Sequence, residues 1–480
     1  MTPGLRRSPT LPAMPGLADG ARAFRHRNYR LFFGGQLVSL IGSWMQTVAQ
    51  SWLVLQLTGD PFILGVVMAA QFVPVMALGL FGGLIADALP KRRTLVVSQI
   101  AKMAVSFTLF ALVASGSVEV WQVLLLATLA GVANVFDMPT RQAFSVEMVG
   151  REDVANAVAL NSAMFNGARI VGPAIAGLVI GAFGIATAFL IDAVSFLAVI
   201  AALLAMREAE LRLPPPMARP GTVGEVIAGV REGLRYVGST PLVLLAVAGV
   251  GLVATFGMNF PVIIPVLAQE VLHSDASGYG FLMAASGIGS LTAALTIAFS
   301  RRARPALIVI GGIVVGLGEI VLGVSGSFPL SLALMYLVGF GAIAMAATAN
   351  TTIQLVVPDQ LRGRTMSVYV TVFAGSTPIG GLLMGWVASQ FGVDVSLVAG
   401  GMACAIVGLA GLAWLRSAGG RVALATELGM HGTAPQAATA SARVVAPGAI
   451  DAQPLPDPAP GATATAPAPR APAVGRPESG

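Results

Sequence analysis

Five charged side chains lie inside stretches of the sequence that are otherwise apolar. They are Lys102, Asp137, Arg169, Asp192 and Glu319. An unpaired charge among apolar groups is costly, so each of these residues must find a partner, bind a proton or serve the function of the protein. Ion pairing and proton transfer are therefore the chemistry that the sequence suggests. Asp137, Arg169, Asp192 and Glu319 are our candidates for coupling an ion to that function.

The composition places these charges in a membrane protein. Of the 480 residues, 56% are hydrophobic and only 10% are charged, and the mean hydropathy is +0.82. A soluble domain carries about 25% charged residues, whereas a helix that crosses a hydrocarbon core of ~30 Å needs about 20 apolar ones. We expect an all-α membrane protein with twelve transmembrane helices, at residues 30–57, 62–89, 94–115, 120–142, 158–182, 185–206, 241–271, 277–300, 305–325, 328–354, 364–391 and 395–416.

Basic residues are confined to alternate connections between these helices. They include Arg22, Arg25, Arg27, Lys91, Arg92, Arg93, Arg207, Arg212, Arg301, Arg302, Arg362, Arg364, Arg416 and Arg421. The other connections hold Asp60, Glu119, Asp275 and Asp394, and no Lys or Arg. Because Lys and Arg favour cytoplasmic loops, this asymmetry predicts that both termini are cytoplasmic.

Composition also divides the chain into segments. Residues 1–29 form an expected cytoplasmic N-terminal segment, without the apolar core of a cleavable signal peptide. Two six-helix bundles follow at 30–206 and 241–416. Between them, 207–240 is an expected cytoplasmic linker, whose amphipathic stretch either lies on the lipid surface or is a plain linker helix. The Ala/Pro-rich residues 417–480 are an expected disordered cytoplasmic tail.

Several classes of partner are excluded by the residue types. The net charge of +6 comes from short connections and not from one face, so we expect no nucleic acid partner. The single Cys404 and three scattered histidines predict no disulfide, metal site or other cofactor. No phosphate-binding Gly-rich loop and no Ser/His/Asp set occurs, so we predict that the chain is not an enzyme. We expect a monomer in the lipid bilayer.

An internal repeat relates the two bundles. Gly65-x-x-Met68 recurs as Gly280-x-x-Met283, 215 positions later. Five residues of the helix expected at 158–182 and its end each recur 208 positions later, namely Phe165, Gly167, Gly172, Gly177 and Gly184. The sequence therefore predicts two pseudo-symmetric halves, and such repeats place the substrate near the bilayer midplane between them.

Depth within the helices relates the charged candidates to each other. Counting ~1.5 Å per residue from the same membrane surface puts Arg169 at ~16 Å and Asp192 at ~21 Å. We expect these two to pair or to share a polar network, as a structural pair or as a proton relay. Glu319 lies at similar depth without a basic neighbour, so we expect it either to be protonated or to have only a packing role. Lys102 is expected to extend toward the nearer surface, and Asp137 is expected to pair with Arg141 one turn away.

The connection after the second helix contains a charged motif. Its residues are Gly83, Asp87, Lys91, Arg92 and Arg93. Their spacing resembles the signature loop of the major facilitator superfamily, although Ala88 and Pro90 depart from its pattern. The resemblance implies that Asp87 latches the cytoplasmic side by pairing with Arg141 and with the positive N-terminal end of the helix near Arg364. A solvated loop whose charges only set orientation is the alternative.

The helix expected at 158–182 contains Gly167, Gly172, Pro173 and Gly177, which resemble the antiporter motif of exporters in that superfamily. An ordinary small-residue helix contact is the alternative. The chain further resembles the enterobactin-exporter-like branch from about residue 23 to 416, and most specifically over 134–196. The residues that carry the resemblance are Phe136-Asp137-Met138-Pro139-Thr140-Arg141, Asn156-Ala157, Leu160-Asn161-Ser162, Asp192-Ala193-Val194-Ser195-Phe196 and Pro358-Asp359-Gln360-Leu361-Arg362-Gly363-Arg364. A helix 4 Arg common among relatives is absent, since Ala127 occupies its position.

These resemblances imply the major facilitator fold, with a cavity lined mainly by helices 1, 4, 7 and 10. The candidate cavity residues are Gln46, Gln50, Asn134, Phe256, Asn259 and Phe260, each with a helix contact or a lipid-facing ring as the alternative role. The implied function is export of a small-molecule substrate, a siderophore or an amphipathic drug, across the bacterial inner membrane, coupled to protons or another ion. An importer of the same fold, a membrane-embedded enzyme and a non-transporting sensor or scaffold remain alternatives.

Overall fold

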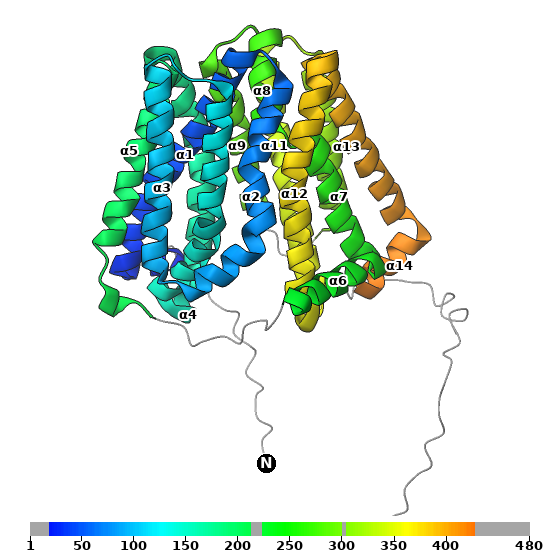
Figure 1. The fold of residues 1–480 in the computed structure, drawn as a ribbon. Coiled ribbons are helices and arrows are strands. Elements are labelled where there is room, and N and C mark those ends of the chain that lie inside the picture. The colour runs from blue at the N-terminus through cyan, green and yellow to red at the C-terminus, as the bar shows by residue number, and fades with distance from the viewer. Residues whose placement is uncertain (1–18, 213–222, 300–303, 428–480) are drawn as a thin grey trace, which may run out of the picture. The chain divides into compact units, whose positions relative to one another are not determined.

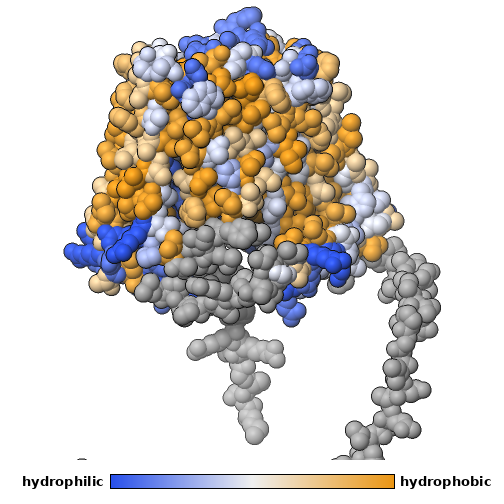
Figure 2. All heavy atoms as spheres, in the orientation of Figure 1, coloured by the Kyte–Doolittle hydropathy of each residue, from blue (hydrophilic) through white to orange (hydrophobic). Residues whose placement is uncertain are grey.

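The computed structural model describes residues 19–212, 223–299 and 304–427, and for residues 79–88 it describes the backbone alone. These parts of the chain form helices and contain no strand. Ten helical segments among them are long and apolar enough to cross a membrane. Figure 2 shows that apolar residues cover most of the visible face between polar residues at its two ends, as a lipid-facing surface requires.

The N-terminal half begins with the short 3-10 helix η1 (Asp19–Arg25). It continues with α1 (Arg27–Thr58), α2 (Pro61–Ala88), α3 (Lys91–Ala114), α4 (Val120–Phe183) and α5 (Ile185–Leu204). α4 covers the two predicted helices at 120–142 and 158–182 and the connection between them. The chain turns at Gly150, whose φ of 75° lies in the left-handed region that glycine tolerates.

The C-terminal half contains the matching helices. They are α7 (Pro241–Gly257), α8 (Phe260–Val266) with the π-helix η3 (Leu267–Val271), α9 (Ala276–Ala298), α10 (Ala306–Val324), α11 (Phe328–Val356), α12 (Asp359–Phe391) and α13 (Val393–Arg416). The single helix predicted at 241–271 is interrupted at Met258 and Asn259, which are not helical. Pro261 has no N–H to donate to the carbonyl of Gly257, so the series of backbone hydrogen bonds along the helix is interrupted there.

α1 is not among the ten apolar segments because one side of it is polar. The side chains on that side include Gln36, Ser39, Ser43, Gln46 and Gln50. When α1 is added and α4 is divided at Gly150, the helices match the twelve predicted ranges.

Two helices lie outside the predicted spans. α6 (Val223–Ser239) forms within the linker predicted at 207–240 and packs beside α12 (Figure 1). α14 (Ala418–Glu427) lies in the segment that we predicted as a disordered tail. A carboxylate oxygen of Glu427 accepts a hydrogen bond of 3.2 Å from the N–H of Leu242, which anchors α14 to the start of α7. The remainder of the tail lies outside the described residues.

The helical body has two chemically different ends. Lys91, Arg92, Arg207, Arg364 and Arg416 lie at one end, which we call the basic end. The opposite end, which carries Asp60, Glu119, Asp275 and Asp394 at helix starts, is called the acidic end.

The two halves touch through glycines near the acidic end. A Cβ on Gly65 of α2 would lie 2.3 Å from the carbonyl oxygen of Gly381 in α12, and a Cβ on Gly280 of α9 would lie 2.4 Å from that of Pro173 in α4. Gly65 and Gly280 are related by the internal repeat, so the two contacts are pseudo-symmetric. Absence of a side chain at each position lets the backbones approach.

Replacing Gly65 or Gly280 by Ala should therefore weaken the contact between the halves. Overpacking of this kind costs about 1–3 kcal/mol, so we expect a lower midpoint of thermal unfolding for each variant in detergent. Gly34→Ala is the matched control, because a Cβ there would meet nothing within 4 Å. Equal midpoints for Gly65→Ala, Gly280→Ala and the control would contradict the contact.

Candidate functional site

A cavity of about 460 Å³ lies in the interior of the helical body. Its wall comes mostly from α1, α2, α3 and α4, with Pro261 and Val262 of α8 and Ala374 of α12 added from the C-terminal half. Uncharged polar side chains on the wall are Gln36, Ser39, Ser43, Gln46, Thr47, Gln50, Ser51, Gln71, Gln99 and Asn134. Three of these, Gln46, Gln50 and Asn134, are cavity candidates from the sequence.

Charged residues of the N-terminal half meet beside this cavity. Asp137 of α4 is fully buried, and its Oδ2 lies 2.9 Å from the Nζ of Lys102 in α3. Arg141, one turn further along α4, forms an ion pair with the same carboxylate. The pairing of Asp137 with Arg141 agrees with the sequence prediction. Lys102 does not extend toward the surface as we predicted, because a buried carboxylate is within its reach.

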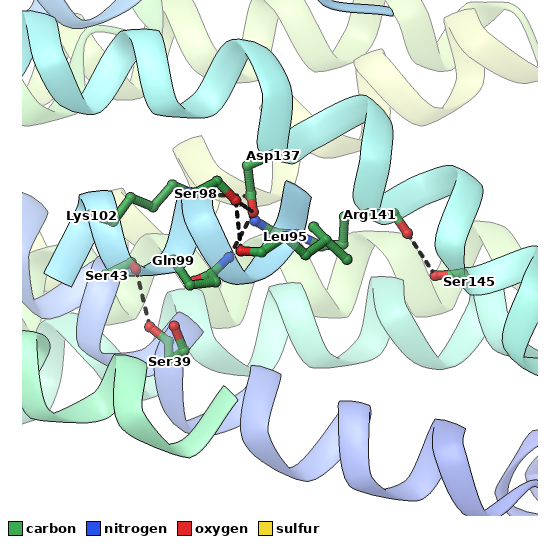
Figure 3. A network of polar contacts seen from close by, with 9 residues as sticks. All are labelled: Ser39, Ser43, Leu95, Ser98, Gln99, Lys102, Asp137, Arg141 and Ser145. Carbon is green, nitrogen blue, oxygen red and sulfur yellow. Dashed lines mark hydrogen bonds and ion pairs between the residues drawn. The ribbon is translucent and has the colours of Figure 1, made fainter. Parts of the chain in front are cut away.

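Two further donors from α3 complete this network, which Figure 3 shows. Gln99 donates from Nε2 to Oδ1 of Asp137 at 2.6 Å, and the Ser98 hydroxyl donates to the same oxygen at 3.1 Å. Ser98, Gln99 and Lys102 share one face of α3 by their spacing. Sequence reasoning missed Ser98 and Gln99. Their spacing from Lys102, a charged residue in an apolar helix, could have indicated that all three contact the same partner.

Arg169 and Asp192 do not pair, which corrects our prediction from depth. Among the described residues Asp192 accepts from the Ser106 hydroxyl of α3 at 2.5 Å, while the Arg169 guanidinium lies 5.9 Å from the ring centroid of Trp44 in α1. A Cβ on Gly42 would lie 2.9 Å from Oδ1 of Asp192, so this carboxylate faces α1 and α3. Counting residues gives depth in a helix, but not the direction in which a side chain points.

A second polar site lies inside the C-terminal half. Glu319 of α10 is 4% exposed and Asn259 is 3% exposed. In the described structure, Oε2 of Glu319 and Oδ1 of Asn259 have no hydrogen-bond partner. Both residues line a space of about 10 Å³, together with Phe256 and Phe260. The sequence placed Phe256, Asn259 and Phe260 on the central cavity, but the interruption between α7 and α8 turns them toward Glu319.

Two basic residues of the charged motif form ion pairs at the basic end. Lys91 lies 2.6 Å from Glu147, which is 3% exposed, and Arg92 pairs with Glu208. Arg93 is exposed, and Gly83 and Asp87 lie outside the described side chains, so the predicted contact of Asp87 with Arg141 stays a prediction. Arg364 pairs with Glu232 of α6. Glu147, Glu208 and Glu232 were missed because nothing local to them in the sequence reveals distant partners.

The helix glycines that resemble an antiporter motif have separate neighbours. A Cβ on Gly172 would lie 2.5 Å from the Cβ of Trp44 in α1, and one on Gly177 would lie 2.8 Å from the carbonyl oxygen of Ala276 in α9. The carbonyl of Pro173 faces Gly280, whereas Gly167 has open space around it. Gly172 thus serves packing within one half, and Gly177 serves contact between the halves.

Comparison with known proteins gives the family of this fold and site. The family model described as "Transmembrane secretion effector" matches residues 19–434. The chain belongs to the transmembrane secretion effector family. It is therefore a transporter of the major facilitator type, and its buried charges and cavity belong to a membrane transporter.

Relatives of this transporter include efflux proteins. The multidrug efflux pump Tap of Mycolicibacterium fortuitum is 31% identical over 75% of this chain and 88% of its own length. The staphyloferrin A transporter of Staphylococcus aureus is 25% identical, over 76% and 90%. The enterobactin exporter EntS of Shigella boydii is 24% identical, over 80% and 91%.

Solved structures of other transporters share the fold of this protein. A point mutant of the nucleoside transporter NupG superimposes with a TM-score of 0.66, covering 81% of this chain and 99% of its own at 13% identity. A bacterial homologue of the lysosomal transporter Spinster superimposes with a TM-score of 0.63, over 83% and 98%, at 14% identity.

Asp137→Ala should destabilise this transporter strongly. Lys102 and Arg141 would lose the buried carboxylate between them, and breaking a buried ion pair in this way costs about 3–5 kcal/mol. The measurement is the midpoint of thermal unfolding in detergent. Asp359→Ala is the control. Asp359 forms an ion pair of 2.5 Å with Arg362, but the Asp359 side chain is 86% exposed, so this pair should contribute little to stability. Similar midpoints for the two variants would mean that the network around Asp137 is not a buried charge cluster.

Proposed function

We propose that this protein exports small molecules, siderophores or amphipathic drugs, across the bacterial inner membrane by alternating access. The observation that carries the proposal is a cavity with polar and apolar lining residues, beside halves that touch through glycine backbones near one end. The cavity extends from Val54 and Leu64 near that acidic end to Gln36 and Arg141 nearer the basic end. A substrate held there would be released when the glycine contacts part.

The orientation that we propose places the basic end and both termini in the cytoplasm. Lys and Arg gather at that end, which the distribution of charges across bacterial membranes favours for the cytoplasmic side. The glycine contacts would then close the end of the cavity that is remote from the cytoplasm, which suits the uptake of a substrate for export. Relatives named as efflux pumps and exporters support the same direction.

Proton entry is the proposed driving force, and buried carboxylates are the proposed proton carriers. Asp192 and Glu319 each have one buried oxygen without a hydrogen-bond partner in the described structure, so protonation would lower the cost of a buried carboxylate charge in either half. Asp137 differs, because Lys102 and Arg141 already offset its charge. We therefore assign coupling first to Asp192 and Glu319, and a positioning role to Asp137. We propose that Arg169 has a positioning role as well, because its guanidinium lies over Trp44 and would orient that ring on the cavity wall.

Inside-out membrane vesicles test export and coupling together. With ATP hydrolysis acidifying the vesicle interior, we expect uptake of fluorescein or rhodamine 123, and loss of uptake when nigericin collapses the pH gradient. Asp192→Asn and Glu319→Gln should each remove most of the gradient-driven uptake, because the variant side chains cannot release a proton. Asp359→Asn, at an exposed site, is the matched control.

The pattern of vesicle uptake separates the alternatives. Uptake confined to right-side-out vesicles would indicate an importer. No gradient-driven movement in either orientation, with dye binding intact, would indicate a sensor and overturn the proposed transport.

A further inference from the structure

The charges on the wall of the central cavity have one sign. Lys102 and Arg141 line the cavity, and no described lining residue is acidic. Asp137 is 0% exposed and does not reach the cavity, whereas the side chains of Lys102 and Arg141 keep 14% and 25% of their surface exposed. The buried carboxylate of Asp137 is thus shared by two cations, and Lys102, Arg141 and Asp137 together carry a net charge of +1.

A wall of this charge discriminates between ligands by sign. A bound anion can accept hydrogen bonds from the guanidinium and ammonium groups, and charge-assisted bonds to Arg are stronger than neutral ones. A bound cation would meet like charge on two partly buried groups, where electrostatic repulsion is less screened than between fully exposed charges. The polar amides on the wall do not alter this preference, because glutamine and asparagine carry no charge.

Aromatic rings lie on the same wall. Trp44 and Phe165 have ring centroids 5.7 Å apart in an edge-to-face arrangement, and both line the cavity. The guanidinium of Arg169 lies over Trp44, which adds a third cation close to the wall. Phe72 supplies another ring. A ligand with an apolar or aromatic body can contact these rings while its charged group reaches Arg141.

We propose that the cavity selects amphipathic anions, with a carboxylate or other oxyanion bound by Arg141 and Lys102 and an apolar body against Trp44 and Phe165. This selection rests on the proposed function, since it names the class of substrate that the transporter carries. The same chemistry disfavours organic cations of similar size.

A matched pair of dyes tests the selection by binding alone. Fluorescein and rhodamine 123 share a xanthene skeleton with a pendant ring, but fluorescein is an anion and rhodamine 123 a cation at neutral pH. Purified protein in nanodiscs is titrated against each dye, fluorescence anisotropy is recorded, and empty nanodiscs of the same lipid provide the background. We expect fluorescein to bind at least about tenfold more tightly, the difference that one charge-assisted hydrogen bond supplies.

Variants of the two cations assign the preference to this site. Arg141→Gln and Lys102→Gln each lower the net charge of Lys102, Arg141 and Asp137 from +1 to 0 and still leave Asp137 one cationic partner, so both should fold. Each should weaken fluorescein binding by about tenfold, and Arg141→Lys should restore part of it. Arg416→Gln, which removes an exposed charge at the end of α13, should bind fluorescein as the unaltered protein does.

The outcomes separate this inference from the proposed function. Equal or tighter binding of rhodamine 123, or fluorescein binding that is insensitive to both Gln variants while their unfolding midpoints stay normal, would overturn anion selection. Transport of either dye in vesicles would still stand in that case. Selective fluorescein binding without any gradient-driven transport would instead overturn the proposed function and leave an anion site.

Discussion

Two helical bundles in lipid gain nothing from the hydrophobic effect when they touch, so they adhere where small residues let their backbones approach. In this protein those residues are Gly65, Gly177 and Gly280, which bring α2 against α12 and α4 against α9 near the acidic end. Among the described residues this contact consists of close backbone packing and a hydrogen bond of 3.1 Å from the Ser277 hydroxyl to the Gly177 carbonyl, without an ion pair. Its separation would therefore leave no charge unpaired in the membrane, as the proposed alternating access requires.

The chemistry is distributed less symmetrically than the contacts. The N-terminal half supplies most of the cavity wall and the network of Lys102, Asp137 and Arg141. The C-terminal half keeps its carboxylate, Glu319, away from the cavity and beside the interruption between α7 and α8. Duplication of a six-helix unit accounts for the paired glycine contacts, while the two halves carry different polar groups. The proposed substrate site and Asp192 in the N-terminal half would be linked to Glu319 in the C-terminal half through the glycine contacts between them.

Sequence reasoning predicted the helices well because apolar length and charge asymmetry are strong local signals. Gly65 and Gly280 were found by their repeat, and Asp137 with Arg141 by their separation of one helical turn. The sequence did not reveal the direction of side chains around each helix axis. Arg169 and Asp192 were therefore paired wrongly, and Asn259 was assigned to the cavity although a proline-induced interruption turns it toward Glu319. Partners such as Glu147 and Ser106 come from distant parts of the chain, and only tertiary packing identifies them.

A reversible cross-link across the acidic end tests the central claim that the halves must part there. A Cβ on Gly181 of α4 would lie 2.8 Å from the Ser277 hydroxyl oxygen of α9, a separation that suits a disulfide between cysteines at both positions. In a Cys404→Ala background, oxidation of the Gly181→Cys, Ser277→Cys double variant should stop gradient-driven dye uptake, and a reductant should restore it. The single variants should be insensitive to both reagents. Undiminished uptake by protein that mass spectrometry shows to be fully cross-linked would contradict the account.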